Sequence, residues 1–201
     1  MLKKIVTMLA LTGSLFAMHE AELNLNNYDL NAKLDLDMGQ FNTAVDPDTV
    51  FVGARYLHGS HYHSGRDLKK DEDLFDAHFS VGQHFRGNGT VTLALGAKFV
   101  YTSINSYNFY ALPLGIAGSY ELPLGLPIPF AVGGSIYYAP EVLAWQDAKN
   151  YLEYTVFLDV QIIDRAALTA GYRTINTDFD VEERGDLVFN AAWFAGVKFR
   201  F

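Results

Sequence analysis

The sequence predicts an all-β protein, an antiparallel up-and-down transmembrane β-barrel of about ten strands. In the last stretch, Leu187 to Phe201, an unbroken apolar row alternates with a more polar row. A period of two is typical of a strand between two different environments. Ten residues separate the aromatic ends of three apolar rows, which are Phe75 and Phe85, Tyr110 and Tyr120, and Phe189 and Phe199.

The spacing of ten residues matches the height of the apolar band on an outer-membrane barrel. Ten residues of strand rise roughly 33 Å, and a tilt of about 40° reduces the rise to roughly 25 Å, the height of the apolar band on outer-membrane barrels. Aromatic side chains at both ends of such rows are typical of membrane interfaces. An edge strand of a soluble sandwich is the alternative explanation of the last stretch, but it does not account for the repeated spacing.

The composition excludes several classes of protein. The chain has 201 residues, which suits one domain, and half of them are hydrophobic. After residue 17 there is no run of 18 apolar residues, so a membrane-spanning helix is not expected in the mature chain. With no cysteine, the chain has no disulfide framework, thiolate zinc site or lipoprotein anchor. A net charge of −8 without a basic cluster argues against nucleic-acid binding.

The N-terminus has the pattern of a secretory signal peptide. Lys3 and Lys4 precede an apolar region from Ile5 to Phe16, and small residues lead to a cleavage site after Ala17. We therefore divide the chain into a signal peptide, 1–17, and a barrel, 18–201. An uncleaved anchor helix is the alternative, but the apolar region is too short for it. An exported barrel belongs in the outer membrane of a Gram-negative bacterium.

Turn signals separate the expected strands. Short turns are expected at 26–27, 86–89, 123–127 and 164–165, and longer connections at 39–48, 58–72, 104–108, 140–149 and 176–186. From Tyr28 onward the alternation gives nine strands. Because bacterial barrels usually have an even number of strands, a tenth is expected at about Glu20 to Asn26. Eight strands is the alternative, if the first segments merge and one weak segment is not a strand.

The C-terminal residues suggest how the barrel is assembled. Gly196, Phe199 and the terminal Phe201 match the C-terminal assembly signal of outer-membrane barrels, although Phe194 stands where that signal usually has a polar residue. The expected partners are therefore outer-membrane lipid and, through the last strand, the barrel-assembly machinery. A small solute is a further possible partner.

Four stretches carry a resemblance to a known family. They are Glu22 to Asn27, Tyr137 to Leu143, Gly171 to Thr174 and Gly196 to Phe201. Together with the overall layout from about Ala21 to Phe201, they resemble the YfaZ family of outer-membrane proteins. The resemblance implies a barrel in the outer membrane. It implies no catalytic or ligand-binding residues.

Charged residues on the polar rows are expected inside the barrel. Small barrels fill their lumen with such side chains, which pair because an unpaired buried charge is costly. A second hypothesis is a hydrolase site at the outer mouth, in which Asp76 orients His78 as a general base and Glu153 faces them. The expected lumen cluster comprises Arg55, Asp76, His78, Lys98, Glu153 and Arg173.

Two outer loops hold other candidate residues. His58, His61 and His63 are close enough in sequence to bind a metal ion, although their spacing matches no specific motif and a solvated loop is the simpler explanation. Trp145, in an apolar loop, either folds inward to narrow the mouth or packs on the adjacent strands, and we favour packing. No cofactor is expected.

The expected function is structural, or that of a narrow pore for small solutes, and not that of an enzyme. A passage would run beside the wall of small inward residues, and the charged cluster would act as a plug. These small residues are Gly82, Gly96, Ala111, Gly115, Ala117, Gly133 and Ser135.

Overall fold

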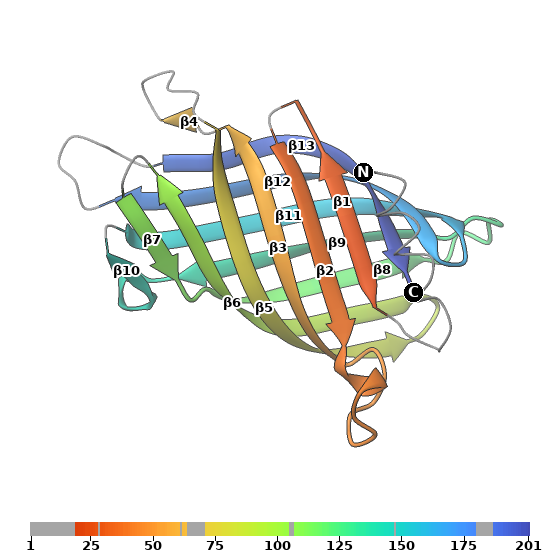
Figure 1. The fold of residues 1–201 in the computed structure, drawn as a ribbon. Helices are drawn as coiled ribbons and strands as arrows, with labels where there is room; N and C mark the ends of the chain where they lie inside the picture. Colours follow the sequence, from red (N-terminus) through yellow and green to blue (C-terminus); the bar gives the residue numbers. More distant parts are fainter. Residues whose placement is uncertain are drawn as a thin grey trace, which may run out of the picture.

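The computed structural model describes residues 19–27, 29–60, 62–63, 71–104, 107–146, 148–179 and 187–201. The signal-peptide segment lies outside these residues. None of the described helices is long and apolar enough to cross a bilayer. The strands of these residues form one antiparallel sheet that closes into a ten-stranded barrel (Figure 1).

The strands follow one another around the barrel in chain order. They are β1 (Glu20–Leu25), β2 (Asp29–Asp37), β3 (Val50–Ser60), β5 (Asp71–Arg86), β6 (Thr90–Ile104), the split strand β7 (Tyr107–Ala111) and β8 (Leu114–Leu122), β9 (Phe130–Ala139), β11 (Ala148–Ile163), β12 (Ala166–Phe179) and β13 (Leu187–Arg200). Two short strands, β4 (Tyr62–His63) and β10 (Ala144–Gln146), and two short 3-10 helices, η1 (Met38–Gln40) and η2 (Glu141–Leu143), complete the fold.

The barrel closes between its first and last strands. β1 pairs with β13 from Glu20 opposite Arg200 to Leu25 opposite Ala195. Beyond them, His19 and Phe201 exchange two backbone hydrogen bonds, each 3.0 Å long. His19, the first described residue of the barrel, and Phe201 therefore lie at the same end of the barrel, where the arrow of β13 ends (Figure 1). We call this the inner end and the opposite end the outer end.

The predicted alternation is confirmed along most strands. Apolar residues that share a row are exposed on the outside of the barrel, for example Phe75, Phe79, Leu95 and Ile116. The side chains of the opposite row point into the lumen. The turns predicted at 86–89, 123–127 and 164–165 are also confirmed, although the second extends to residue 129, and Gly125 has a positive φ of 64° within it. Glycine adopts such a φ without steric cost.

Phe189 is a correction to the predicted outer row. The pairing between β12 and β13 shifts by one residue, because Ile175 lies opposite Asn190 while Asn176 lies opposite Val188. Phe189 is the extra residue in this bulge and is only 3% exposed, packed in the apolar core. A bulge inserts one residue and so changes which face the side chain joins. Phe189 therefore does not belong to an outer aromatic belt.

Three predicted outer connections were too long, because the strands extend further than the sequence pattern indicated. β3 continues to Ser60 and β5 begins at Asp71, so residues 58–60 and 71–72 of the predicted 58–72 loop belong to paired strands. β12 continues to Phe179, inside the predicted loop at 176–186. In the predicted loop at 140–149, β10 pairs with β7 through Trp145 opposite Tyr110, and β11 begins at Ala148.

A contiguous apolar cluster closes the outer part of the lumen, and we call it the outer apolar layer. Tyr151 and Phe109 stack in it with ring centroids 5.8 Å apart. Leu143 of η2 packs against it. The layer is contributed by β3, β5, β6, β7, β9, β10, β11, β12 and β13, and consists of Leu57, Leu74, Val100, Phe109, Ala111, Ala139, Ala144, Ala148, Tyr151, Ile175 and Phe189.

Candidate functional site

A network of buried charged side chains crosses the lumen beneath the outer apolar layer. Arg55 of β3 donates from both terminal nitrogens to Glu153 of β11, at 2.7 Å each. Its Nε also donates to Asp76 of β5 at 2.5 Å. Glu153 is 1% exposed and Asp76 is 0% exposed. These carboxylates are therefore shielded from water, and Arg55 donates hydrogen bonds to both of them.

The Arg55–Glu153 pair joins two strands on opposite sides of the barrel. β3 and β11 are separated by five strand positions in either direction around the ten-stranded barrel. The bidentate pair therefore joins opposite walls and passes through the middle of the lumen. A fork of two parallel hydrogen bonds is also the strongest geometry available to an arginine and a carboxylate.

Other side chains complete the pairing of Glu153. Lys98 of β6 donates to Glu153 at 2.8 Å, and the Tyr151 hydroxyl donates to it at 2.6 Å. The ammonium group of Lys98 also lies 4.1 Å from the centre of the Tyr137 ring. Glu153 therefore has three donating side chains from three strands, which offset the cost of burying its charge.

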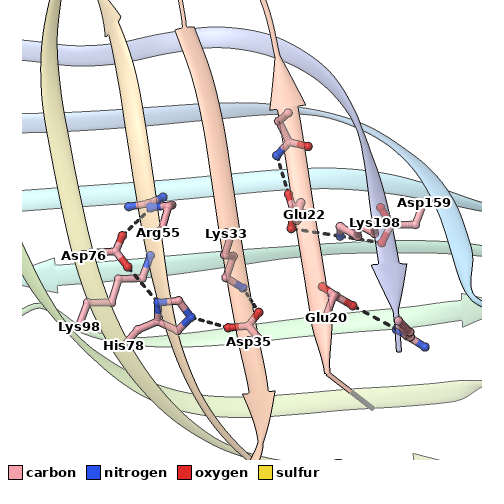
Figure 2. Close-up of polar contacts among 12 residues, drawn as sticks. Glu20, Glu22, Lys33, Asp35, Arg55, Asp76, His78, Lys98, Asp159 and Lys198 are labelled. Carbon is pink, nitrogen blue, oxygen red and sulfur yellow. Dashed lines mark hydrogen bonds and ion pairs between the residues drawn. The ribbon is translucent and has the colours of Figure 1, made fainter. Parts of the chain in front are cut away.

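His78 continues the network toward the inner end. Its Nδ1 lies 2.9 Å from Asp76 and its Nε2 lies 2.5 Å from Asp35 of β2. Asp35 in turn pairs with Lys33 at 2.6 Å. Figure 2 shows this chain of contacts from Arg55 through Asp76 and His78 to Asp35 and Lys33. We call these residues, together with Lys98, Tyr151 and Glu153, the central network.

Arg173, the sixth residue of the predicted lumen cluster, faces the lumen but bonds elsewhere. It donates to Asp29 of β2 at 2.8 Å and to Asn190 of β13 at 3.4 Å. Asn190 donates to the same aspartate. The structure thus joins Arg55, Asp76, His78, Lys98 and Glu153 directly, while Arg173 belongs to a neighbouring group.

A third polar group lies nearer the inner end. Lys198 of β13 donates to Asp159 of β11 at 2.8 Å and lies 4.0 Å from Glu22 of β1 (Figure 2). Its ammonium group also lies 4.0 Å from the centre of the Phe157 ring. These contacts cover the inner part of the lumen wall with paired charges.

Sequence reasoning missed Lys33, Asp35 and Tyr151 as members of the central network. The signal for two of them was present, because Lys33 and Asp35 lie on the polar row of β2, which alternation places inside the barrel. Tyr151 lies two residues before Glu153 and therefore shares its face. Partner choice could not be predicted, because it depends on which strands close opposite one another.

The predicted passage beside the small-residue wall is narrowed by aromatic rings. A Cβ at Gly96 would lie 2.7 Å from the Tyr137 hydroxyl, and one at Gly133 would lie 2.5 Å from the Phe157 ring. The Tyr137 ring also lies over Gly115. These glycines make room for large side chains from neighbouring strands, so much of the space that their small size suggests is occupied.

Of the three histidines proposed as metal ligands, only His58 has a described side chain. His58 lies on the outer surface, where its Nδ1 is 2.7 Å from Asp73. His61 and the side chain of His63 lie outside the described residues. Elsewhere in those residues no group of three metal-binding side chains is present. Trp145 is 44% exposed and does not fill the mouth, where Leu143 and Ala144 pack instead.

Gly196, Phe199 and Phe201, the predicted assembly signal, lie on the closing strand. Gly196 faces Asn24 of β1, whose side chain occupies the space where a Cβ would be. Phe199 is exposed on the outer face. The Phe201 ring packs edge-on against His19, with centroids 5.8 Å apart, and His19 stacks on Phe41 at 5.3 Å.

The apolar exterior, the closed antiparallel sheet and the polar lumen define a transmembrane β-barrel. A family model described as YfaZ precursor matches residues 2–201. The chain therefore belongs to the YfaZ family. A search of curated proteins gave no match.

Solved structures with a similar fold are outer-membrane proteins. The outer membrane channel DcaP of Acinetobacter baumannii has a TM-score of 0.36 and 10% identity, over 90% of this chain and 54% of that chain. OmpT of Vibrio cholerae has a TM-score of 0.33 and 9% identity, over 90% of this chain and 64% of that chain. The NanC porin has a TM-score of 0.39 and 12% identity, over 92% of this chain and 100% of that chain. The chain thus spans about half of DcaP and less than two thirds of OmpT.

Proposed function

We propose that this protein is an integral outer-membrane barrel with a closed lumen, whose role is structural or limited to very narrow solute passage. The Arg55–Glu153 pair carries the proposal, because it joins opposite walls at 2.7 Å in the middle of the lumen. The outer apolar layer adds a second barrier, since its members come from most strands of the barrel. An ion would have to displace both barriers to cross.

The location and processing of the chain form part of the proposal. The description of the family as a precursor supports cleavage of a signal peptide, which we place after Ala17. Lipid contacts the exposed apolar rows, and the barrel-assembly machinery binds the last strand through Gly196, Phe199 and Phe201. Cell fractionation tests the location, because recovery in the soluble periplasm without a heat-modifiable band would rule it out.

A hydrolase site has less support. Both ring nitrogens of His78 already face carboxylates, at 2.9 and 2.5 Å, and its side chain is 8% exposed. A general base needs a free nitrogen within reach of water or substrate. Glu153 accepts hydrogen bonds from three side chains and is not available to a substrate. We therefore expect no peptide hydrolysis by the purified barrel.

Liposome swelling tests the closed lumen. Vesicles that contain the purified barrel are placed in iso-osmotic solutions of sugars of increasing size. We expect no swelling above that of empty vesicles, even with the smallest sugar, because the central network and the outer apolar layer block diffusion. Rapid swelling that falls with sugar size would show an open pore and would overturn the proposal.

Phe201→Ser is expected to reduce the amount of folded barrel in the membrane several-fold. The change removes the ring that packs on His19 and alters the proposed recognition signal, while the backbone pairing of the two residues remains available. The measurement is the heat-modifiable band in isolated outer membranes. Phe85→Ser is the matched control, because Phe85 is also an aromatic residue at the inner end but is exposed and lies on β5, away from the closing strand. An equal loss in both variants would contradict a specific role of Phe201.

A further inference from the structure

Four buried polar atoms on one side of the lumen have no hydrogen-bond partner within the described part of the chain. They are Asn31 Oδ1, Asn24 Oδ1, Thr169 Oγ1 and Asp159 Oδ1. Asn24, Asn31 and Thr169 are each at most 2% exposed. Buried polar atoms are normally paired, so four exceptions in one barrel require an explanation.

The strand register places these four residues in one continuous row. Asn31 lies opposite Asn24, and Asn24 lies opposite Gly196. Gly196 lies opposite Thr169, and Thr169 lies opposite Asp159. We call these residues the acceptor row. It crosses five neighbouring strands from β2 to β11, and Gly196 at its centre leaves room for the Asn24 side chain.

One end of the acceptor row opens at the inner end of the barrel. A small pocket of about 70 Å³ lies there, and Asp159 and Lys198 form part of its wall. The other end of the row reaches Asn31, which lies on the same face of β2 as Asp29 and Lys33. The row therefore leads from the inner mouth to the central network and to the Arg173 group.

We propose that the acceptor row is the path by which the lumen hydrates, and that it binds small solutes carrying N–H or O–H donors. An unpaired buried acceptor is destabilising, so a donor that reaches it recovers a hydrogen bond that the protein itself does not supply. Separating the side chains along this wall to admit water or a solute therefore costs less free energy than separating the side chains along a fully paired wall. The inference rests on the proposed closed lumen, because in a closed lumen the path ends at the central network.

The charges around the path favour cations over anions. Three of the four unpaired atoms are amide or carboxylate oxygens, which accept hydrogen bonds but cannot donate them. The acidic side chains beside the row and its pocket also outnumber the basic ones. The acidic residues are Glu20, Glu22, Asp29, Glu121, Asp159 and Asp164, and the basic residues are Lys33, Arg165, Lys198 and Arg200.

Cysteine labelling tests the path directly, because the natural chain has no cysteine. Thr169→Cys and Asn24→Cys are treated with a cationic aminoethyl and an anionic sulfonatoethyl methanethiosulfonate. We expect both variants to react, and to react several-fold faster with the cation, after normalisation to Asn88→Cys in an exposed turn. Ala139→Cys in the outer apolar layer should not react.

The results separate this inference from the proposed function. If Thr169→Cys and Asn24→Cys are as unreactive as Ala139→Cys while vesicles stay closed, the path does not exist and the closed lumen stands. If the anion reacts faster, the expected ligand class is wrong. If vesicles swell freely and both variants still react, the closed lumen fails while access to the row remains.

A pair of valine substitutions provides an independent test. Thr169 and Thr102 are both 2% exposed, but the Thr102 hydroxyl donates to the Asp73 carbonyl at 2.7 Å, whereas the Thr169 hydroxyl has no partner among the described residues. Thr169→Val should leave the urea midpoint of unfolding unchanged or raised, and Thr102→Val should lower it. A loss of stability in Thr169→Val equal to that of Thr102→Val would show that the Thr169 hydroxyl is already paired, and would overturn the proposal.

Discussion

Glu153→Gln is expected to destabilise the folded barrel by about 3–5 kcal/mol, because it leaves buried cationic groups without their main counter-charge. Arg55 would then keep only Asp76 as a charged partner, and Lys98 would lose the carboxylate that lies 2.8 Å away. The measurement is urea unfolding of the barrel in lipid vesicles, followed by tryptophan fluorescence of the two tryptophans in the chain.

Adding Arg55→Met to Glu153→Gln tests whether the loss of stability comes from the unpaired charge of Arg55. Removing Arg55 together with the Glu153 charge, as Arg55→Met with Glu153→Gln, leaves Lys98 and Asp76 as a balanced pair. The double variant should therefore be more stable than Glu153→Gln alone. Losses that simply add would contradict direct coupling of the two residues.

The control for the stability cycle is an exposed ion pair. Arg200 lies 3.3 Å from Glu20 and its side chain is 65% exposed. Arg200→Met should change the stability by about 1 kcal/mol or less, because water already screens an exposed pair. A loss as large as that of Glu153→Gln would show that the assay reports charge removal in general and not the burial of the central network.

Opening both barriers together is expected to convert the closed barrel into a conducting one. Arg55→Ala with Glu153→Ala removes the pair that spans the lumen, and Leu57→Ala with Phe109→Ala removes bulk from the outer apolar layer. Each pair of substitutions leaves the other barrier in place, so each alone should leave the conductance near the baseline. The quadruple variant should give stable conductance steps.

The fold of each variant must be checked before its conductance is interpreted. The heat-modifiable band on gels provides this check, because it reports the intact barrel. If either pair alone opens the barrel fully, the barriers do not act in series. If the folded quadruple variant remains closed, other side chains block the lumen, with Tyr137 and Phe157 as the first candidates, since they cover Gly96, Gly115 and Gly133.

Much of the barrel could be predicted from the sequence, because strand alternation is a local property. The rows that end at Phe75, Tyr120 and Phe199 identified the outer face, and the parity of strand number identified β1. Phe189 could not be placed correctly by the same reasoning. A one-residue bulge between β12 and β13 depends on the pairing of two strands and leaves no local mark in the sequence.

The lumen residues could also be predicted only in part. Alternation predicted that Arg55 and Glu153 face inward, but their pairing depends on which strands stand opposite each other after closure. Arg173 illustrates the same limit, because its partner Asp29 lies 144 residues away in the chain. The acceptor row is also a property of closure, since its residues come from both ends of the sequence and meet only where β1 pairs with β13.

Planar-bilayer conductance of the unmodified barrel tests the central claim most directly. The claim is that the central network and the outer apolar layer close the lumen. We predict that the purified, heat-modifiable barrel inserts into the bilayer without producing stable conductance steps. Reproducible steps of large conductance from the same preparation would contradict the claim, because ions could not cross a lumen spanned by the Arg55–Glu153 pair.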